Sequence, residues 1–406
     1  GVVVYDRNGQ YGLAPASCQK IVTSAAAFEI LGKDFKYQTQ FGYNGTLEGT
    51  SLKGSLMITG SGDPTLGSWR WKATTDETIL SRMKEELAKL KIQSADNFII
   101  DNTKWGTQTL PTGWVWEDIG QYYGAGCSAF NWHENQYDIV LRPGKKMGDP
   151  VTILSANPAG VLKTVNELST GAKGSGDQVY VYHSPYSTIN FLRGTAPLDM
   201  DSLVVSASSI DGQPLFENDF LPGLTGSITI NKISSGITNY EQTGNFMFND
   251  KPGHIICSFS SPSLDSMNYW FLKKSLNLYG EAFLKTMAFE KTKYGTTDSG
   301  VSVVRNFWAE KGIEKSSLKI LDGSGLSPSN RLTTKALVTI LQYAKQRPWF
   351  NSFYDALPDM NGIKMKEGSF KLGFEDGKWQ FWNEKGEAVK TVIYKSGEIV
   401  SEQNSK

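Results

Sequence analysis

Ser17 and Lys20 stand three residues apart in a stretch that the sequence predicts to be helical. Positions i and i+3 share one face of a helix, so the hydroxyl and the amine can meet. A lysine that is desolvated by apolar neighbours has a lowered pKa and can accept the proton of a serine. The first turn of a helix also stabilises developing negative charge. The pair therefore suits acyl-transfer chemistry with Ser17 as the nucleophile.

The Ser-x-x-Lys pattern is weak by itself, because it also occurs at residues 81–84 and 316–319. The former lies in a charged helix and the latter precedes a strand. Ser17 alone of the three follows a Pro-Ala step and opens an alanine-rich apolar helix. The competing interpretation is an ordinary serine at a helix start with a solvated lysine one turn later.

Ser275 and Asn277 form a second candidate pair. The hydroxyl could relay a proton, and the amide could bind a substrate carbonyl or a lysine. Ser-x-Asn is a common tripeptide, and a capped connection between two helices is the alternative interpretation.

A Lys-x-Gly sequence near a strand is the third candidate, and two stretches compete for it. Lys366 is followed by Gly368 and Ser369, whereas Lys395 is followed by Gly397. Both also fit an ordinary strand end that enters a turn.

The surrounding periodicity predicts the elements that must position these groups. Helices are expected at residues 16–31, 76–90, 264–273, 278–287, 302–311 and 334–346, and strands at 1–6, 55–59, 98–101, 178–182, 203–206, 363–365, 379–382 and 390–394. A strand and helix, a long β-rich middle, and then helices and strands indicate an α/β (α+β) domain that is split by a large insertion.

Composition excludes several function classes. The 406 residues carry 41 Lys and Arg against 41 Asp and Glu, so a general nucleic-acid-binding surface is not expected. No apolar run is long enough for a transmembrane helix. The three His and three Cys are too scattered for a metal site or a His-dependent triad, so any hydrolase would need another base. Cys18 is expected to be a small buried residue. Because the sequence opens at Gly1 without a charged leader, a removed signal peptide is expected.

The three motifs in this order are similar to those of the penicillin-recognising serine enzymes. More specifically, the chain resembles the low-molecular-mass class C penicillin-binding proteins, which are D-alanyl-D-alanine carboxypeptidases and endopeptidases of peptidoglycan. The resembling segments are residues 13–27, 60–66, 122–132, 274–281 and 322–332. The resemblance implies a transpeptidase-like domain of a β-sheet flanked by helices, formed by residues 1–36 and 255–406, with residues 37–254 as a β-rich insertion of one or two subdomains.

The resemblance also implies roles for the first two motifs. Ser17 would be the acylated nucleophile and Lys20 the base that activates it. Ser275 would pass a proton to the leaving amine, and Asn277 would orient the substrate amide.

For the third motif, the resemblance implies substrate binding by Lys366, Gly368 and Ser369. Lys366 would attract the terminal carboxylate of the substrate, and the backbone N–H groups of Ser17 and Ser369 would form an oxyanion hole. Lys366 is preferred over Lys395 because a longer tail, with room for further strands, follows it.

Two features depart from the family pattern. Glu367 occupies the place of a small hydroxyl residue, and it would repel a substrate carboxylate if it faced the cleft. Residues 376–387 look more like a MORN-type β-hairpin than like the family's last strands.

The expected function is therefore a serine D-Ala-D-Ala carboxypeptidase or endopeptidase. It would act without a cofactor or metal on peptidoglycan stem peptides, bind β-lactams covalently, and lie in the periplasm or elsewhere outside the cytoplasm. The alternatives are a catalytically inactive binding protein of the same fold and, third, a β-lactamase or esterase.

Overall fold

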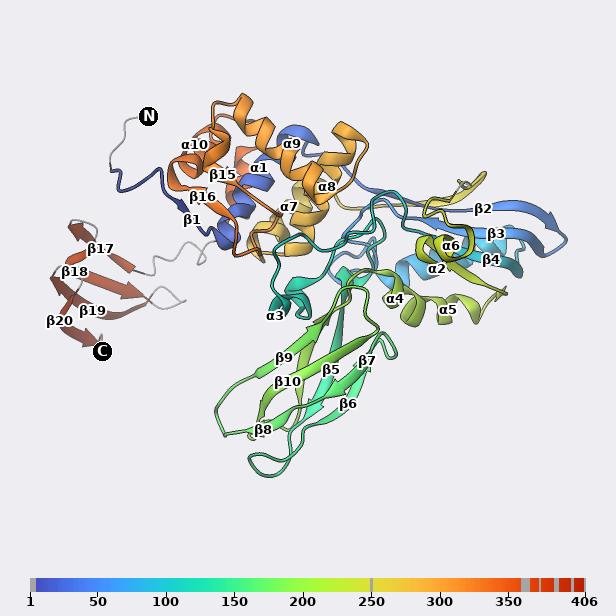
Figure 1. Cartoon of the computed structure of the whole chain (residues 1–406), viewed down its shortest axis with the longest axis horizontal. Coiled ribbons are helices and arrows are strands. Elements are labelled where there is room, and N and C mark those ends of the chain that lie inside the picture. The colour runs from blue at the N-terminus through green and yellow to red at the C-terminus, as the bar shows by residue number, and fades with distance from the viewer. Residues whose placement is uncertain are drawn as a thin grey trace. The chain divides into compact units, whose positions relative to one another are not determined.

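The computed structural model of the chain describes residues 5–248, 251–358, 366–371, 374–382, 387–395 and 398–404. The chain divides into two compact units, Gly1–Asp355 and Ala356–Lys406 (Figure 1). The first unit contains the first two sequence motifs, and the second contains the third.

Helices of the first unit gather around α1 (Lys20–Ile30), which follows the 3-10 turn η1 (Ala16–Gln19). Four later helices contact α1, as Figure 1 shows: α7 (Leu264–Lys273), α8 (Asn277–Thr292), α9 (Thr297–Glu310) and α10 (Thr334–Ala344). The buried face of α1 includes Ala25, Ala26 and Ala27, whose small side chains let the neighbouring helices approach closely. Ser17 and Lys20 therefore lie at the start of a helix that four other helices contact.

Shorter elements complete the helical part. They are η5 (Lys315–Ser317), α11 (Phe350–Ala356) and a small antiparallel sheet in the order β1 (Gly12–Leu13), β16 (Arg331–Thr333), β15 (Leu318–Lys319). The segment between β15 and β16 approaches η1: a Cβ on Gly325 would lie 1.9 Å from the carbonyl oxygen of Ala16. Only a glycine fits this position, which also has a φ of +88°.

A six-stranded sheet follows α1 in the chain. Its strand order is β12 (Thr229–Ile230), β4 (Ser94–Asp101), β3 (Ser51–Thr59), β2 (Gln38–Glu48), β14 (His254–Ser260), with β13 (Ile233–Ser235) also paired to β4. The parallel strands β3 and β4 are connected by α2 (Asp76–Lys89), as a parallel crossover requires. Ile79, Met83 and Leu87, four residues apart, form the stripe by which α2 joins the hydrophobic core.

Two further sheets share that core. One has the order β11 (Leu203–Ser208), β5 (Gln136–Arg142), β6 (Thr152–Asn157); the other contains β7 (Lys163–Asn166), β10 (Ile189–Pro197) and β8 (Ser169–Gly171), with β9 (Gln178–His183) paired to β10. Short helical segments connect these strands: α3 (Trp116–Ile119), η2 (Tyr122–Gly124), η3 (His133–Asn135), α4 (Gln213–Leu215), η4 (Phe216–Phe220), α5 (Leu221–Thr225) and α6 (Gly236–Thr243).

The second unit is an antiparallel meander. Its strands follow chain order: β17 (Lys366–Lys371), β18 (Phe374–Trp382), β19 (Ala388–Lys395) and β20 (Glu398–Asn404). Trp379 and Val392 oppose each other across β18 and β19 and are both buried. This cross-strand pair gives the small sheet an apolar centre.

The predicted mixed α/β class is confirmed, as are the positions of the predicted helices. One strand prediction was wrong where it can be compared: Tyr5 and Asp6 are not in a strand, and residues 1–4 lie outside the described part. The Asp6 carboxylate instead accepts a hydrogen bond from the backbone N–H of Gly9, which favours a turn. The predicted strand at 363–365 also lies outside the described residues. Several strands had no prediction of their own, among them β2, β5, β10, β14 and β20.

Candidate active site

Ser17 lies in the turn η1, at the solvent-exposed start of the helical segment, and Lys20 is the first residue of α1. The Lys20 Nζ atom is 3.1 Å from the Ser17 Oγ atom. Lys20 is 2% exposed, because α7, α8 and the loop after β15 close around it. The predicted contact between hydroxyl and amine is therefore present in the structure, at the boundary between solvent and core.

Two oxygen atoms compete with Ser17 for the protons of Lys20. The amine donates to Asn277 Oδ1 at 2.6 Å and to the backbone carbonyl oxygen of Ser324 at 2.8 Å. A neutral amine has two N–H groups and one lone pair. These two acceptors use both N–H groups, which leaves the lone pair facing the Ser17 hydroxyl.

Burial lowers the pKa of Lys20 from 10.5 to about 8, because desolvation disfavours the charged amine. The negative charges of Glu281 and Asp322 oppose this shift without cancelling it. The amine is thereby neutral in a useful fraction of molecules near neutral pH.

Ser275 and Asn277 come from the connection between α7 and α8. The Ser275 hydroxyl donates to Ser17 Oγ at 2.8 Å, and Ser275 has a φ of +56°. A serine in this left-handed region is strained by about 1 kcal/mol or more, which the surrounding structure must offset. The alternative that these residues merely cap a helix is not supported, because Leu276 is the N-cap residue of α8 and no side chain caps it.

Asn277 uses both ends of its side-chain amide. Its Oδ1 accepts from Lys20, and its Nδ2 donates to the carbonyl oxygen of Tyr123 at 2.8 Å. Of the two uses that the sequence left open, the structure displays the contact with lysine.

A buried carboxylate pair supports the loop after β15. Glu281, one helical turn after Asn277, accepts hydrogen bonds from the backbone N–H groups of Gly323 and Ser324. Asp322 accepts from the side chains of Gln19 and Trp114. These contacts fix the Ser324 carbonyl that binds Lys20.

The environment of Glu281 is strongly desolvated. Burial raises its pKa to about 8, and the neighbouring charge of Asp322 acts in the same direction. Lys285, a turn further along α8, has a lowered pKa for the same reason and donates to the carbonyl oxygens of Gln108 and Cys127. Helix α8 thus carries three polar side chains on one buried face, at positions 277, 281 and 285.

A cavity of about 300 Å³ opens over these groups. Ser17, Ser275 and Asn277 line it, together with Tyr122 and Tyr123 of η2. Tyr122 is half exposed, so the cavity wall formed by the 37–254 segment is aromatic and open to solvent. An extended peptide can enter a cavity of this size and reach Ser17.

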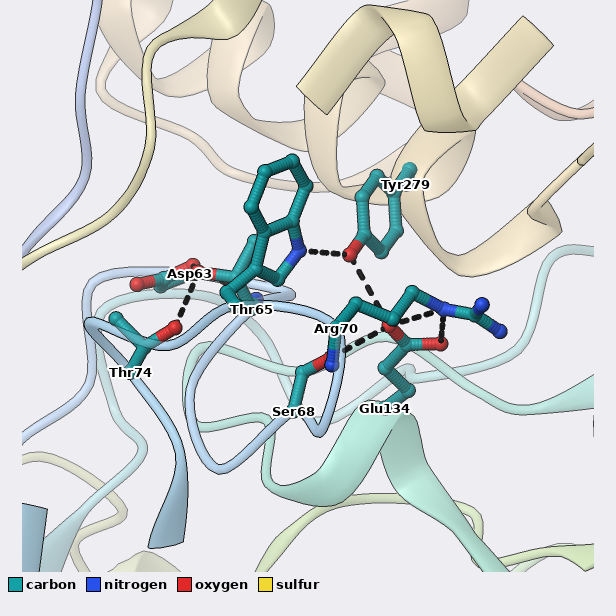
Figure 2. Close-up of polar contacts among 8 residues, drawn as sticks. Asp63, Thr65, Ser68, Arg70, Thr74, Glu134 and Tyr279 are labelled. Atoms are coloured by element: carbon teal, nitrogen blue, oxygen red, sulfur yellow. Dashed lines mark hydrogen bonds and ion pairs between the residues drawn. The ribbon is translucent and has the colours of Figure 1, made fainter. Parts of the chain in front are cut away.

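Glu134 lines the same cavity and is the centre of a second network (Figure 2). Its side chain is 1% exposed, pairs with the Arg70 guanidinium at 2.9 Å, and accepts from Ser68. It also accepts from the hydroxyl of Tyr279 in α8, which in turn accepts from Trp71. This network ties η3 and the loop after β3 to the helix that carries Asn277.

The backbone around Glu134 is unusual. His133, Glu134 and Asn135 have φ values of 52°, 51° and 53°. Three successive left-handed residues other than glycine cost on the order of 1 kcal/mol each, and the Arg70 pair and the hydrogen bonds of Asn135 hold them in place.

Two predictions for this region need comment. Cys18 was expected to be buried, and this was wrong, because it is exposed. Residues 16–19 form a 3-10 turn with three residues per turn, so Cys18 does not share the inner face of α1. The buried hydrogen bonds that connect Gln19, Glu281, Asp322 and Ser324 were not predicted. The available signal was the spacing of four residues between Asn277 and Glu281, which places both on one face of a helix.

Lys366, Gly368 and Ser369 lie in β17 of the second unit. Their side chains are outside the described part of the structure, so the third motif stays a prediction. Within the part that the structure describes, no group of three or more His, Cys, Asp or Glu could bind a metal ion, and no helix is long and apolar enough to cross a membrane.

A buried lysine beside an exposed serine, with a second serine and an asparagine in the same cleft, is typical of serine acyl-transfer sites. Comparison with known proteins supplies the family. The family model of the D-Ala-D-Ala carboxypeptidase 3 (S13) family matches residues 1–377. The chain belongs to this family.

Similar proteins come from several organisms. The D-alanyl-D-alanine carboxypeptidase of Actinomadura sp. (strain R39) is 27% identical over 367 residues, which cover 88% of this chain and 65% of that protein. The D-alanyl-D-alanine carboxypeptidase DacB of Haemophilus influenzae is 24% identical over 349 residues, covering 84% and 68%. The chain thus spans about two thirds of the length of these curated relatives.

The fold has a counterpart among solved structures. The crystal structure of penicillin-binding protein 4 (dacB) from Haemophilus influenzae superimposes with a TM-score of 0.74 at 20% sequence identity, covering 95% of this chain and 85% of that chain. The expected penicillin-binding fold is thereby confirmed.

Proposed function

We propose that this chain is a serine D-Ala-D-Ala carboxypeptidase or endopeptidase that acts on peptidoglycan stem peptides through an acyl-Ser17 intermediate and is acylated by β-lactams. The observation that carries the proposal is the state of Lys20. Its pKa is lowered to about 8, and its Nζ atom lies 3.1 Å from a solvent-accessible hydroxyl, while Asn277 Oδ1 and the Ser324 carbonyl oxygen can take the two N–H groups that the amine keeps when it is neutral. This arrangement suits a general base for a serine nucleophile.

In the acylation step, the Ser17 Oγ atom attacks the carbonyl carbon of the penultimate D-alanine while Lys20 takes the hydroxyl proton. The resulting oxyanion is stabilised by backbone N–H groups, among them that of Ser17. The C–N bond then breaks. The leaving amine receives a proton through Ser275, whose hydroxyl lies 2.8 Å from Ser17 Oγ, and Ser275 recovers a proton from the Lys20 ammonium.

Deacylation reverses this order with water in place of the amine. Lys20, neutral again, takes a proton from water, the hydroxide attacks the ester carbon, and Ser17 leaves with the returning proton. Hydrolysis of a terminal D-alanine and of a D-alanine cross-link share this acyl-enzyme. Asn277 keeps Lys20 oriented, and the second N–H of its amide can bind the substrate backbone.

We also propose the domain division that the sequence suggested, with residues 37–254 inserted into a peptidase domain of residues 1–36 and 255–406. The packing of α1 against α7, α8, α9 and α10 supports it, because these elements flank the insertion in sequence. The names of the relatives support a D-Ala-D-Ala end as the substrate. We propose that this end belongs to peptidoglycan stem peptides and that the protein acts outside the cytoplasm.

For the third motif we propose that Lys366, with Gly368 and Ser369, binds the carboxylate end of the substrate. Lys366→Ala should then raise KM for a D-Ala-D-Ala peptide, whereas Lys395→Ala, the matched control from the competing stretch, should not. The reverse result would assign the motif to Lys395.

The test of the proposed function is the mass of the intact protein after incubation with benzylpenicillin. Wild type should gain the mass of one drug molecule, and Ser17→Ala should gain none. Ser316→Ala, from another Ser-x-x-Lys sequence, is the control and should behave as wild type. Unmodified protein together with intact drug would refute the proposal and favour a binding protein of the same fold. Hydrolysed drug with unmodified protein would instead indicate a β-lactamase.

A further inference from the structure

A second cavity, of about 350 Å³, lies next to the candidate active site. Gln136 lines both cavities, so they adjoin at the start of β5. Glu134 lines the first cavity and His133, one residue earlier, lines the second. The left-handed turn at residues 133–135 thus separates the two cavities. The proposed acyl-transfer reaction involves residues of the first cavity alone.

The floor of the second cavity is a row of polar side chains across one sheet. Asp138 of β5 pairs in register with Asn157 of β6 and with Ser206 of β11. Directly opposed residues point to the same face of an antiparallel sheet, so the three side chains stand side by side. The Ser206 hydroxyl donates to Asp138 Oδ1 at 2.6 Å. The row therefore offers a carboxylate that accepts hydrogen bonds and an amide that both accepts and donates them.

An aromatic wall stands beside this floor. Trp69 lines the cavity and is 49% exposed, although large apolar side chains are usually covered. Its ring lies 4.9 Å from the ring of His133, and the Arg70 guanidinium lies 5.1 Å from its centroid. Arg70 is itself fixed by its ion pair with Glu134. The indole is thus a prearranged surface rather than a freely moving side chain.

We propose that this cavity binds a sugar residue of the peptidoglycan glycan strand, an N-acetylated hexosamine, while the attached stem peptide occupies the first cavity. An exposed indole face matches the C–H face of a pyranose ring, and a polar row at its side matches the hydroxyl and acetamido groups at the ring edge. The carboxylate of Asp138 accepts from sugar hydroxyls and disfavours an anionic occupant. This inference rests on the proposed function, because it places the glycan to which the stem peptide is attached.

The binding test uses soluble, uncharged oligomers of N-acetylglucosamine, which carry no peptide, so that catalysis plays no part. Isothermal titration should detect binding by wild type and by Ser17→Ala alike. Trp69→Ala should bind at least tenfold more weakly, and Asp138→Asn several-fold more weakly. Trp116→Ala is the matched control: its indole is 44% exposed and lines neither cavity, so binding should be unchanged.

A kinetic comparison adds a second readout. Trp69→Ala should raise KM for a disaccharide-linked stem peptide while leaving kcat, and both parameters for a free D-Ala-D-Ala peptide, unchanged. Equal glycan binding by wild type and Trp69→Ala, or no binding by wild type at millimolar sugar, would overturn the inference. Penicillin acylation of Ser17 without glycan binding would overturn the inference alone. Glycan binding without acylation would overturn the proposed acyl-transfer function alone.

Discussion

The rate at which benzylpenicillin acylates Ser17 should follow the ionisation of Lys20. Only the neutral amine can accept the hydroxyl proton, and burial lowers its pKa to about 8. At pH 7 about one molecule in ten then has a neutral Lys20, against about one in 3,000 for an unperturbed lysine, a roughly 300-fold difference. The larger neutral fraction lowers the activation barrier at neutral pH by at most about 3 kcal/mol, because the desolvated amine is also a weaker base.

The acylation rate constant, measured by rapid quench and intact mass between pH 5.5 and 10, should rise about tenfold per pH unit at first and level off above about pH 8.5. Lys20→Arg should abolish acylation, because a guanidinium stays protonated throughout this range. Lys84→Arg, from another Ser-x-x-Lys sequence, should leave the profile intact. A rate that does not change between pH 6 and 9 would refute the assignment of Lys20 as the base, and one that still rises steeply near pH 10 would refute its lowered pKa.

Three further predictions concern the groups around the site. Because the pKa of Glu281 is raised, the folded state keeps a proton that the unfolded state has lost, and the free energy of unfolding should fall between pH 4.5 and about 8. Urea titrations of Glu281→Gln should show a slope that is less steep in this range by up to about 1.4 kcal/mol per pH unit. Arg70→Ala should lower the free energy of unfolding by about 3 kcal/mol, because it leaves the buried Glu134 carboxylate without its ion pair. The double variant with Glu134→Gln should recover much of this loss, and a negligible loss in Arg70→Ala alone would contradict the prediction. Gly325→Ala should suppress penicillin acylation, because the added methyl group would displace the turn that carries Ser17. Gly312→Ala is the control, with a similar φ of +85° and no atom within 4 Å, and it should acylate at the wild-type rate. Equal rates for the two variants would show that the close approach of Gly325 to Ala16 is unimportant.

Local periodicity predicted much of this fold and part of its site. The spacing of Ser17 and Lys20 implies their contact whatever the rest of the chain does, because a helical turn brings i and i+3 together. Helix α2 was predicted within one residue at its end, since its apolar stripe is a local signal.

Contacts between segments that are far apart in the sequence could not be predicted from local patterns. Nothing local indicates that Lys20 donates to the Ser324 carbonyl, or that Glu134 adopts a left-handed conformation beside Arg70. Both depend on packing between elements far apart in the chain. The prediction that Cys18 is buried failed because it rested on the usual burial of free cysteines, whereas Cys18 lies in an exposed 3-10 turn.

The long sequence separations within the site also bear on how the protein folds during synthesis. The acceptors of Lys20 are 257 and 304 residues further along the chain. At a translation rate of about 5–20 residues per second, α1 emerges roughly 15–60 s before the second of them. Until α7 emerges, α1 lacks the helices that pack against it in the folded protein. The nascent nucleophile segment is therefore a natural client for chaperones, and the enzyme can acquire its reactive centre only after nearly the whole first unit has been made.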